Sequence, residues 1–217
     1  MELILRILCC ALAGVGCGLV SRVWAARLQE RRGLAPQLAE KTERVLSAAM
    51  AVPGGALGAL TTGTAMPACG LALLTICGTV SVIDWTHRII PNQAVLAVLG
   101  LKLLSLLPAS AGVAGVPAFG LLSSLAGLAG CFVLFLLPGF FGKNVGAGDL
   151  KLAAAMGFLL GLRGALVAVL VMGLLVLGYS IVQKQMPMLR FLKTNIPMGP
   201  FIAAGMLVSF LGADLLL

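Results

Sequence analysis

Apolar segments of membrane length recur from one end of this 217-residue chain to the other. Hydrophobic residues make up 60% of the chain and charged residues only 10%, whereas roughly a quarter of an ordinary soluble domain is charged. Apolar segments of this length fold as helices that cross a bilayer, because a helix satisfies its own backbone hydrogen bonds. The sequence therefore predicts an all-α, polytopic membrane helix bundle and excludes a soluble domain with a single anchor.

We expect about eight transmembrane helices, separated by stretches rich in charge, proline or glycine. They cover about residues 3–24, 46–64, 67–84, 92–108, 117–138, 150–162, 164–183 and 197–214. The sixth span, 150–162, is short for a membrane helix. The alternative is a single helix from 150 to 183, but it would place the basic residues that follow it outside the cytoplasm, against the positive-inside rule. A turn at Gly161-Leu162-Arg163-Gly164 is therefore the better interpretation. All of the chain is needed for one integral membrane domain.

The basic residues indicate how the bundle is oriented. Loops 25–45, 84–92, 139–151 and 184–195, with Arg22 at an adjoining helix end, hold 12 of the 15 basic residues. Because lysine and arginine are retained in the cytoplasm, these loops are predicted to be cytoplasmic. The net charge of +8 is thus explained by orientation, and no nucleic acid is expected as a partner. Arginines after the first apolar segment also favour an uncleaved first helix over a signal peptide.

The sequence does not indicate a metal site or a cofactor. Its six cysteines lie within apolar segments and form no Cys-x-x-Cys pair, which favours a packing role. His87 is the only histidine and has no neighbouring set of ligands in the sequence. Neither a metal ion nor a cofactor is therefore expected.

Two aspartates stand out among only 7 acidic residues. Asp84 ends the third expected span, ahead of Pro91-Asn92, and Asp149 opens the sixth, directly after Gly146-Ala147-Gly148. A carboxylate at the edge of the hydrocarbon region is costly and so indicates a functional site. Two carboxylates held close together share a proton, so that one activates water and the other polarises a peptide carbonyl. The pair predicts aspartic-protease chemistry at a membrane surface.

These residues also have structural interpretations, which the sequence leaves open. Asp149 would cap the helix that it opens, and Asp84 would pair with Arg88 at a helix end. Lys151 would either contact one of the carboxylates or the substrate, or extend its ammonium group to the water at the membrane edge. The glycines before Asp149 would let backbone approach a substrate closely.

Three motifs resemble those of the prepilin peptidases, the type IV leader peptidase family of GxGD membrane aspartic proteases. The first is Asp84 with Pro91-Asn92, and the second is Gly146-Ala147-Gly148-Asp149-Leu150-Lys151. The third, Ile196-Pro197-Met198-Gly199-Pro200-Phe201, is similar to the Pro-x-Gly-Pro-Phe signature that opens the family's last helix. The resemblance covers about residues 67–214. It divides the chain into N-terminal helices with a short cytoplasmic loop, residues 1–66, and a GxGD peptidase core, residues 67–217.

The resemblance implies an aspartyl endopeptidase of the cell membrane that removes the leader of type IV prepilins or pseudopilins at the cytoplasmic face. It implies that Asp84 and Asp149 are the catalytic pair. The residues that it implies around them are Pro91, Asn92, Gly146, Gly148, Lys151, Pro197, Gly199 and Pro200. The expected partners are that substrate and the lipid bilayer, and the oligomeric state is not indicated.

The resemblance also bears on a second activity. The family's long bifunctional members carry a cysteine-rich cytoplasmic domain, associated with N-methylation of the processed pilin, after their first helix. Here the loop at 25–45 has no cysteine and is too short for such a domain. A short form without methyltransferase activity is therefore expected.

Other functions predict features that this chain lacks or only partly shares. The presenilin and signal-peptide-peptidase branch, which also uses GxGD, expects a Pro-Ala-Leu element, and that tripeptide does not occur. A small proton- or cation-coupled transporter would favour acids at mid-membrane and an inverted repeat, whereas these acids lie at span edges and no repeat is found. An inactive homologue retained as a scaffold is a third alternative, although both aspartates are present.

Overall fold

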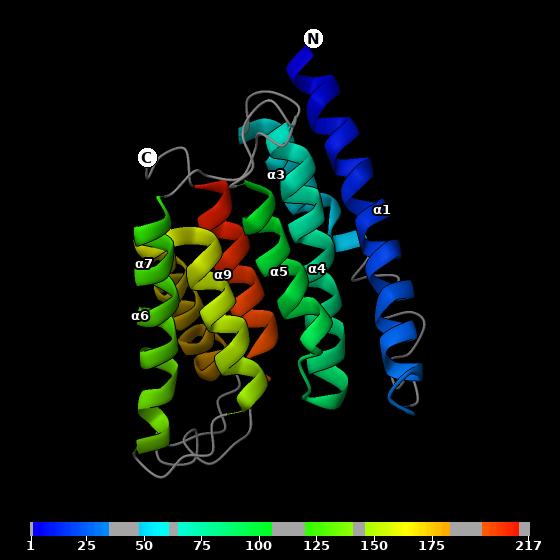
Figure 1. Ribbon diagram of the computed structural model, residues 1–217. Coiled ribbons are helices and arrows are strands. Elements are labelled where there is room, and N and C mark those ends of the chain that lie inside the picture. The colour runs from blue at the N-terminus through cyan, green and yellow to red at the C-terminus, as the bar shows by residue number, and fades with distance from the viewer. Residues whose placement is uncertain are drawn as a thin grey trace.

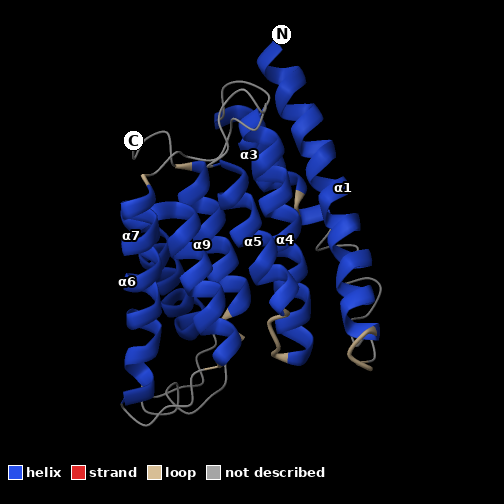
Figure 2. Cartoon of the chain, in the orientation of Figure 1, coloured by secondary structure: helices blue, strands red, loops and turns tan. Residues whose placement is uncertain are grey.

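The computed structural model is a bundle of helices (Figure 1). It describes residues 2–34, 48–60, 65–105, 120–140, 146–182 and 197–212. Within these ranges every regular element is a helix and no strand is present, as Figure 2 shows, so the predicted all-α class is confirmed. The helices are α1 (Glu2–Glu30), α3 (Ala51–Leu60), α4 (Ala65–His87), α5 (Asn92–Ser105), α6 (Leu121–Phe140), α7 (Ala147–Val182) and α9 (Gly199–Leu211).

Four helices are long and apolar enough to cross a membrane, namely α1, α4, α6 and α7. The apolar helices α5 and α9 are shorter, and α3 has 10 residues, about half of the roughly 20 that a bilayer requires. The expected number of about eight transmembrane helices is therefore not confirmed. The loops expected at 108–117 and 184–195, and residues 35–45 of the loop expected at 25–45, lie outside the described residues. The start of that last loop was wrong, because α1 continues to Glu30.

The long helix α7 is broken at Gly161, where φ is 65° and ψ is 179°. This backbone conformation is essentially restricted to glycine. After the break the chain runs antiparallel to α9, because Ser209 donates a 2.8 Å hydrogen bond to the Gly164 carbonyl while the Tyr179 ring packs edge-on against Phe201, at a centroid distance of 5.6 Å. The predicted turn at residues 161–164 thus corresponds to a break in the helix at Gly161, the first of these residues.

Helix α6 and the first half of α7 pack with their backbones in contact. A Cβ added to Gly127 would overlap the carbonyl oxygen of Gly157 and the backbone of Gly161, and a Cβ added to Gly157 would overlap Gly127. Beside this crossing, the Leu162 N–H, which follows the break, donates a 3.2 Å hydrogen bond to Ser123 Oγ on α6. A side chain of α6 thus satisfies a backbone N–H that the break leaves without a partner in its own helix.

We expect Gly127→Ala to lower the melting temperature of the purified protein, because the added methyl group has no space at this crossing. Overpacking of a tight contact costs typically about 1–3 kcal/mol. The matched control is Gly173→Ala on the second half of α7, where an added Cβ meets nothing within 4 Å and alanine favours the helix by about 1 kcal/mol. Thermal unfolding in detergent, followed by circular dichroism, measures both variants. Equal shifts in the two would contradict the close crossing.

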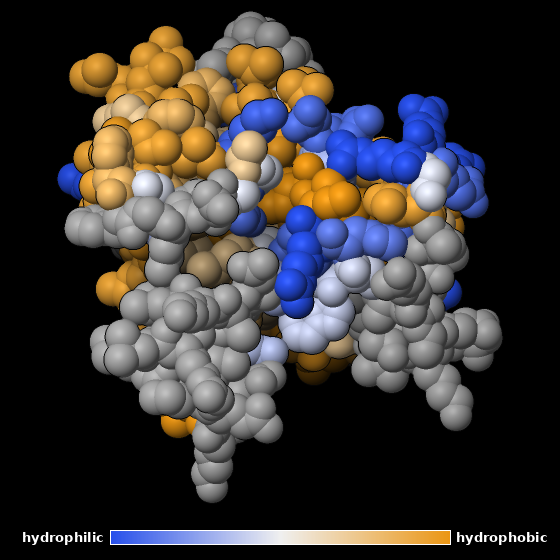
Figure 3. All heavy atoms as spheres, turned by 90° about the horizontal axis from the view of Figure 1, so that it is seen from below, coloured by the Kyte–Doolittle hydropathy of each residue, from blue (hydrophilic) through white to orange (hydrophobic). Residues whose placement is uncertain are grey.

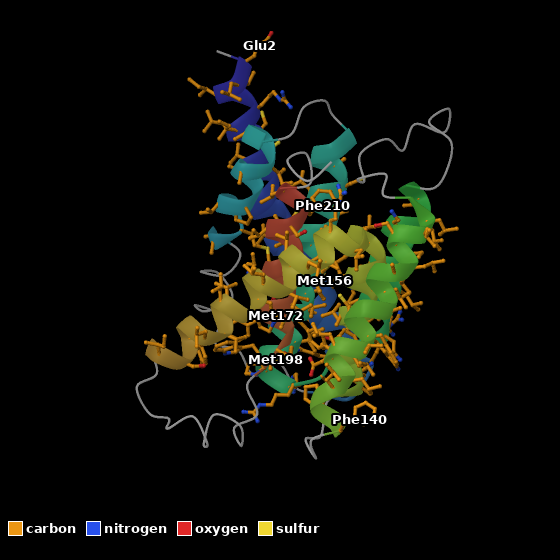
Figure 4. All side chains as sticks on the ribbon, turned by 90° about the vertical axis from the view of Figure 1, so that its left-hand side faces the viewer. Glu2, Phe140, Met156, Met172, Met198 and Phe210 are labelled. Carbon is orange, nitrogen blue, oxygen red and sulfur yellow. The ribbon has the colours of Figure 1, made fainter. Side chains whose placement is uncertain are left out.

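The core lies between α4, α5, α7 and α9. Side chains such as Leu73, Val98, Leu152 and Met206 are no more than 1% exposed there. Figure 4 shows Met156 within the bundle, with Met198 and Phe210 towards opposite ends of α9. This packing holds the first turns of α5, α7 and α9 at the same end of the bundle as the last turn of α4.

The end of α4 is also braced by α1. Ala25 and Leu28 of α1 pack against Val82 and Ile83 of α4. Beyond this contact, Gln29 Nε2 lies 3.4 Å from its hydrogen-bond acceptor, the Thr86 hydroxyl oxygen. The last turn of α4 is therefore supported by neighbouring helices on more than one side.

Candidate active site

The end of the bundle that carries the predicted site is the lower one in Figure 1. The C-terminus of α4 and the N-termini of α5, α7 and α9 meet there. Figure 3 shows this end from below, with hydrophilic atoms in two groups and apolar atoms between them. All three sequence motifs contribute residues to this region.

Asp84 lies in the last turn of α4, and only 4% of its surface is exposed. The helix was expected to end at Asp84, but it continues to His87, because α1 and α9 cover this turn. The Asp84 Oδ2 atom accepts a 2.7 Å hydrogen bond from the Gly199 N–H, at the start of α9. The first N–H groups of a helix lack partners within the helix, so the carboxylate satisfies one of them.

The chain leaves α4 through Arg88, whose φ of 53° is left-handed. The Arg88 N–H donates a 2.9 Å hydrogen bond to the Asp84 carbonyl, which closes the helix end. Ile90 and Pro91 are then buried, and the Pro91 carbonyl accepts a 3.0 Å hydrogen bond from Ala94. Pro91 therefore immediately precedes α5, whose first residue, Asn92, is exposed.

Asp149 lies in the first turn of α7 and is half-buried. The helix begins at Ala147, three residues before the expected start of this span, because the Gly146 carbonyl already accepts a 3.2 Å hydrogen bond from the Leu150 N–H. The charges of Asp149 and Asp84 lie close enough to interact with each other. Two carboxylates 65 positions apart in the sequence are thus neighbours at one end of the bundle.

Three of the predicted glycines lie where a side chain would disturb this arrangement. A Cβ on Gly199 would lie 2.8 Å from Asp84 Oδ2, and one on Gly146 would lie 2.7 Å from Asp149 Oδ2. A Cβ on Gly148 would lie 3.0 Å from the Ile90 Cβ, beside buried Pro91. The glycines therefore allow the motifs to pack against each other.

The remaining predicted residues lie around the pair. Lys151 Nζ lies 3.5 Å from Asn92 Oδ1, and both side chains are exposed, so they link the start of α7 to that of α5. Within the part of the chain that the structure describes, Lys151 forms no ion pair with either aspartate, in keeping with its position at the edge of the bundle. Pro200 is in the first turn of α9, where proline is well tolerated, and Pro197 is half-buried two residues before that helix.

Some residues of the site were not predicted, or were predicted in another role. The contact of Ile90 with Gly148 had no signal in the sequence, since an apolar residue before proline is common. The sequence indicates Arg88 only as a structural partner of Asp84 and gives no sign of its left-handed backbone. The His87 Nε2 atom is buried and has no hydrogen-bond partner among the described residues. No group of three metal-ligating side chains occurs in these ranges either.

The fold and the site define a helical membrane protein with a carboxylate pair at one end of its bundle. The sequence profile of the type IV leader peptidase family matches residues 71–181. The match spans just over half of the chain and includes both aspartates, so the chain belongs to this peptidase family. The match ends before the motif at Pro197–Phe201. Comparison with curated proteins and with solved structures found no significant match.

Proposed function

We propose that this protein is an aspartyl endopeptidase of the cell membrane that removes the leader peptide of type IV prepilins or pseudopilins. The observation that carries the proposal is that Asp84, in the last turn of α4, and Asp149, in the first turn of α7, lie at the same end of the bundle, close enough for their charges to interact. Both residues lie within the stretch that matches the leader peptidase family. A proton-sharing carboxylate pair hydrolyses a peptide without a metal ion or a covalent intermediate.

The proposed chemistry requires different roles of the two carboxyl groups. The ionised group accepts a proton from a water molecule that attacks the scissile carbonyl, and the protonated group donates to the carbonyl oxygen. Gly146 is exposed beside Asp149, so it leaves room for the substrate backbone to approach. Burial of Asp84 limits competing water around the pair.

The proposed active site faces the cytoplasm, which the excess of basic residues in the loops at this end supports. Arg31, Arg32 and Arg88 are exposed at the ends of α1 and α4, and Lys151 is exposed on α7. A peptide segment just outside the cytoplasmic face, attached to an apolar helix in the bilayer, would reach this end of the bundle. This is the geometry of a leader peptide that precedes a membrane-embedded pilin helix.

Co-expression with a prepilin or pseudopilin from the same genome tests the proposal. We expect a loss of mass that corresponds to the leader when the protein is present, and no such loss in its absence. Intact-mass spectrometry of the membrane fraction measures the product.

We also expect an unmodified product N-terminus when this protein is the only one supplied, because the loop at 25–45 has no cysteine-rich domain. An added methyl group would contradict the assignment as a short form.

Metal chelation provides a separate test of the aspartic mechanism. We expect that EDTA and a zinc-selective chelator leave the rate of leader removal unchanged, because the proposed base and acid are both carboxyl groups of the protein. The measurement is the cleavage rate of detergent-solubilised protein before and after dialysis against chelator. Inhibition that added zinc reverses would replace the carboxylate pair with a metal-activated water.

A further inference from the structure

The two carboxylates are held in different ways. Asp84 is almost fully buried, and its Oδ2 atom receives the Gly199 N–H at 2.7 Å. Asp149 is less buried, and within the described ranges its carboxylate receives no hydrogen bond. A hydrogen bond from a backbone N–H stabilises the charged form of a carboxylate. Burial by itself favours the neutral form of Asp84, whereas the hydrogen bond from Gly199 favours its charged form. The hydrogen bond therefore acts to place the negative charge of the pair on Asp84.

Arg88 adds a second difference between the two aspartates. It directly follows the end of α4, where its N–H donates a 2.9 Å hydrogen bond to the Asp84 carbonyl, and its positive charge lies close enough to interact with the Asp84 carboxylate. Arg88 has a left-handed φ of 53°, a conformation that is unfavourable for a residue with a side chain. Glycine or asparagine would fit this helix end at lower cost. An arginine kept in this conformation suggests that its charge serves a purpose beside the pair.

We propose that Arg88 is a positioning residue that makes the pair asymmetric, so that Asp84 carries the negative charge and Asp149 carries the proton before the substrate is cleaved. The Gly199 N–H acts in the same direction. This inference rests on the proposed function and extends it, because it assigns the general base to Asp84 and the general acid to Asp149.

The assignment defines each proton transfer. The Asp84 carboxylate takes one proton from water as the water oxygen bonds to the scissile carbonyl carbon, and Asp149 gives its proton to the carbonyl oxygen. The resulting geminal diol then collapses, and the bond between carbon and nitrogen breaks. Asp84 passes its proton to the departing amine, and Asp149 recovers a proton from the hydroxyl that becomes the new carbonyl. The pair returns to its starting state.

Other charged groups around the pair do not reverse this asymmetry. The start of α7 favours a negative charge on Asp149, but the start of α9 acts in the same way on Asp84 through the Gly199 N–H, and Arg88 adds its positive charge there. The repulsion between the two carboxylates acts equally on both. Lys151 lies against Asn92 and forms no ion pair with Asp149 in the described part of the chain. His87 lies on the last turn of α4, Arg27 and Glu30 lie on the last turns of α1, and the described residues of α9 carry no titratable side chain.

The test is the pH dependence of leader removal by Arg88 variants of the full-length protein in detergent. Without the positive charge, Asp84 loses its proton less readily, so the acidic limb of the profile moves to higher pH. We expect a shift of roughly 0.5–1 pH unit in Arg88→Gln. The shift is modest because Arg88 forms no close ion pair with Asp84 among the described residues, so its charge acts on Asp84 through a high effective dielectric. Arg88→Lys should keep the wild-type limb, which separates charge from the shape of the side chain.

Two further variants complete the test. Arg88→Gly suits the left-handed backbone but lacks the charge, so it should shift the limb as Arg88→Gln does while it folds at least as well. Arg31→Gln removes an exposed charge from the end of α1 and should leave the profile unchanged. An unshifted limb in both Arg88→Gln and Arg88→Gly would overturn the asymmetry. If wild-type protein does not cleave the leader at all, the proposed function itself fails, and the two outcomes are thus distinct.

Discussion

We expect Asp84→Asn and Asp149→Asn each to abolish leader removal, while both proteins remain folded in the membrane. Asparagine matches aspartate in size and still offers a carbonyl oxygen to the Gly199 N–H, so the contact that now measures 2.7 Å can form in Asp84→Asn. An amide neither takes a proton from water nor donates one to a carbonyl oxygen. We expect each variant to lose at least about 100- to 10,000-fold in cleavage rate, the range that a general acid or base contributes.

The control variant is Glu30→Gln, which neutralises an exposed carboxylate at the end of α1. We expect its cleavage rate to match that of wild-type protein. Intact-mass spectrometry of the co-expressed prepilin provides the rate, and thermal unfolding in detergent shows whether each variant is folded. Cleavage that persists in both aspartate variants would exclude the pair, whereas loss of cleavage in Glu30→Gln would indicate a general effect of charge at this end.

The sequence predicts which residues lie together at the candidate site better than it predicts the shape of the bundle. The cost of a carboxylate near hydrocarbon identifies Asp84 and Asp149 without any knowledge of the fold. Helix lengths follow less reliably, since apolar residues suit both a membrane span and a buried core helix. Helix α3 is an example. The apolar segment expected to form a span at 46–64 is long enough to cross a bilayer, whereas the helix that the structure describes there has only 10 residues.

Contacts between distant segments are the part that the sequence could not specify. Asp84 and Gly199 are 115 positions apart, and their hydrogen bond depends on how α4 and α9 pack. The close contact between Gly127 and Gly157 was likewise not predictable. Glycine is frequent in membrane helices, so the sequence does not indicate which two glycines will pack together. The left-handed conformation of Arg88 runs against the preference of its residue type, so only the structure reveals it.

The second large effect is expected from Gly199→Ala. The new Cβ would lie 2.8 Å from both the Oδ2 and the Cβ atoms of Asp84, a separation that real Cβ atoms essentially never have. Either the carboxylate rotates away or the start of α9 withdraws, and in both cases the hydrogen bond from the Gly199 N–H is lost. A displacement of about 1 Å at a reacting group costs on the order of 100-fold in rate, and we expect a loss of that size.

The matched control for this variant is Gly212→Ala at the other end of α9, where an added Cβ would be no closer than 3.5 Å to Val208 O. We expect wild-type cleavage from Gly212→Ala, and a graded loss from Gly199→Ala to Gly199→Val as the side chain grows. Because Gly199 is at the first turn of its helix, the variants should lose activity before they lose their fold, which parallel melting curves would show. Wild-type cleavage by Gly199→Val would mean that the start of α9 does not hold Asp84 in the active enzyme.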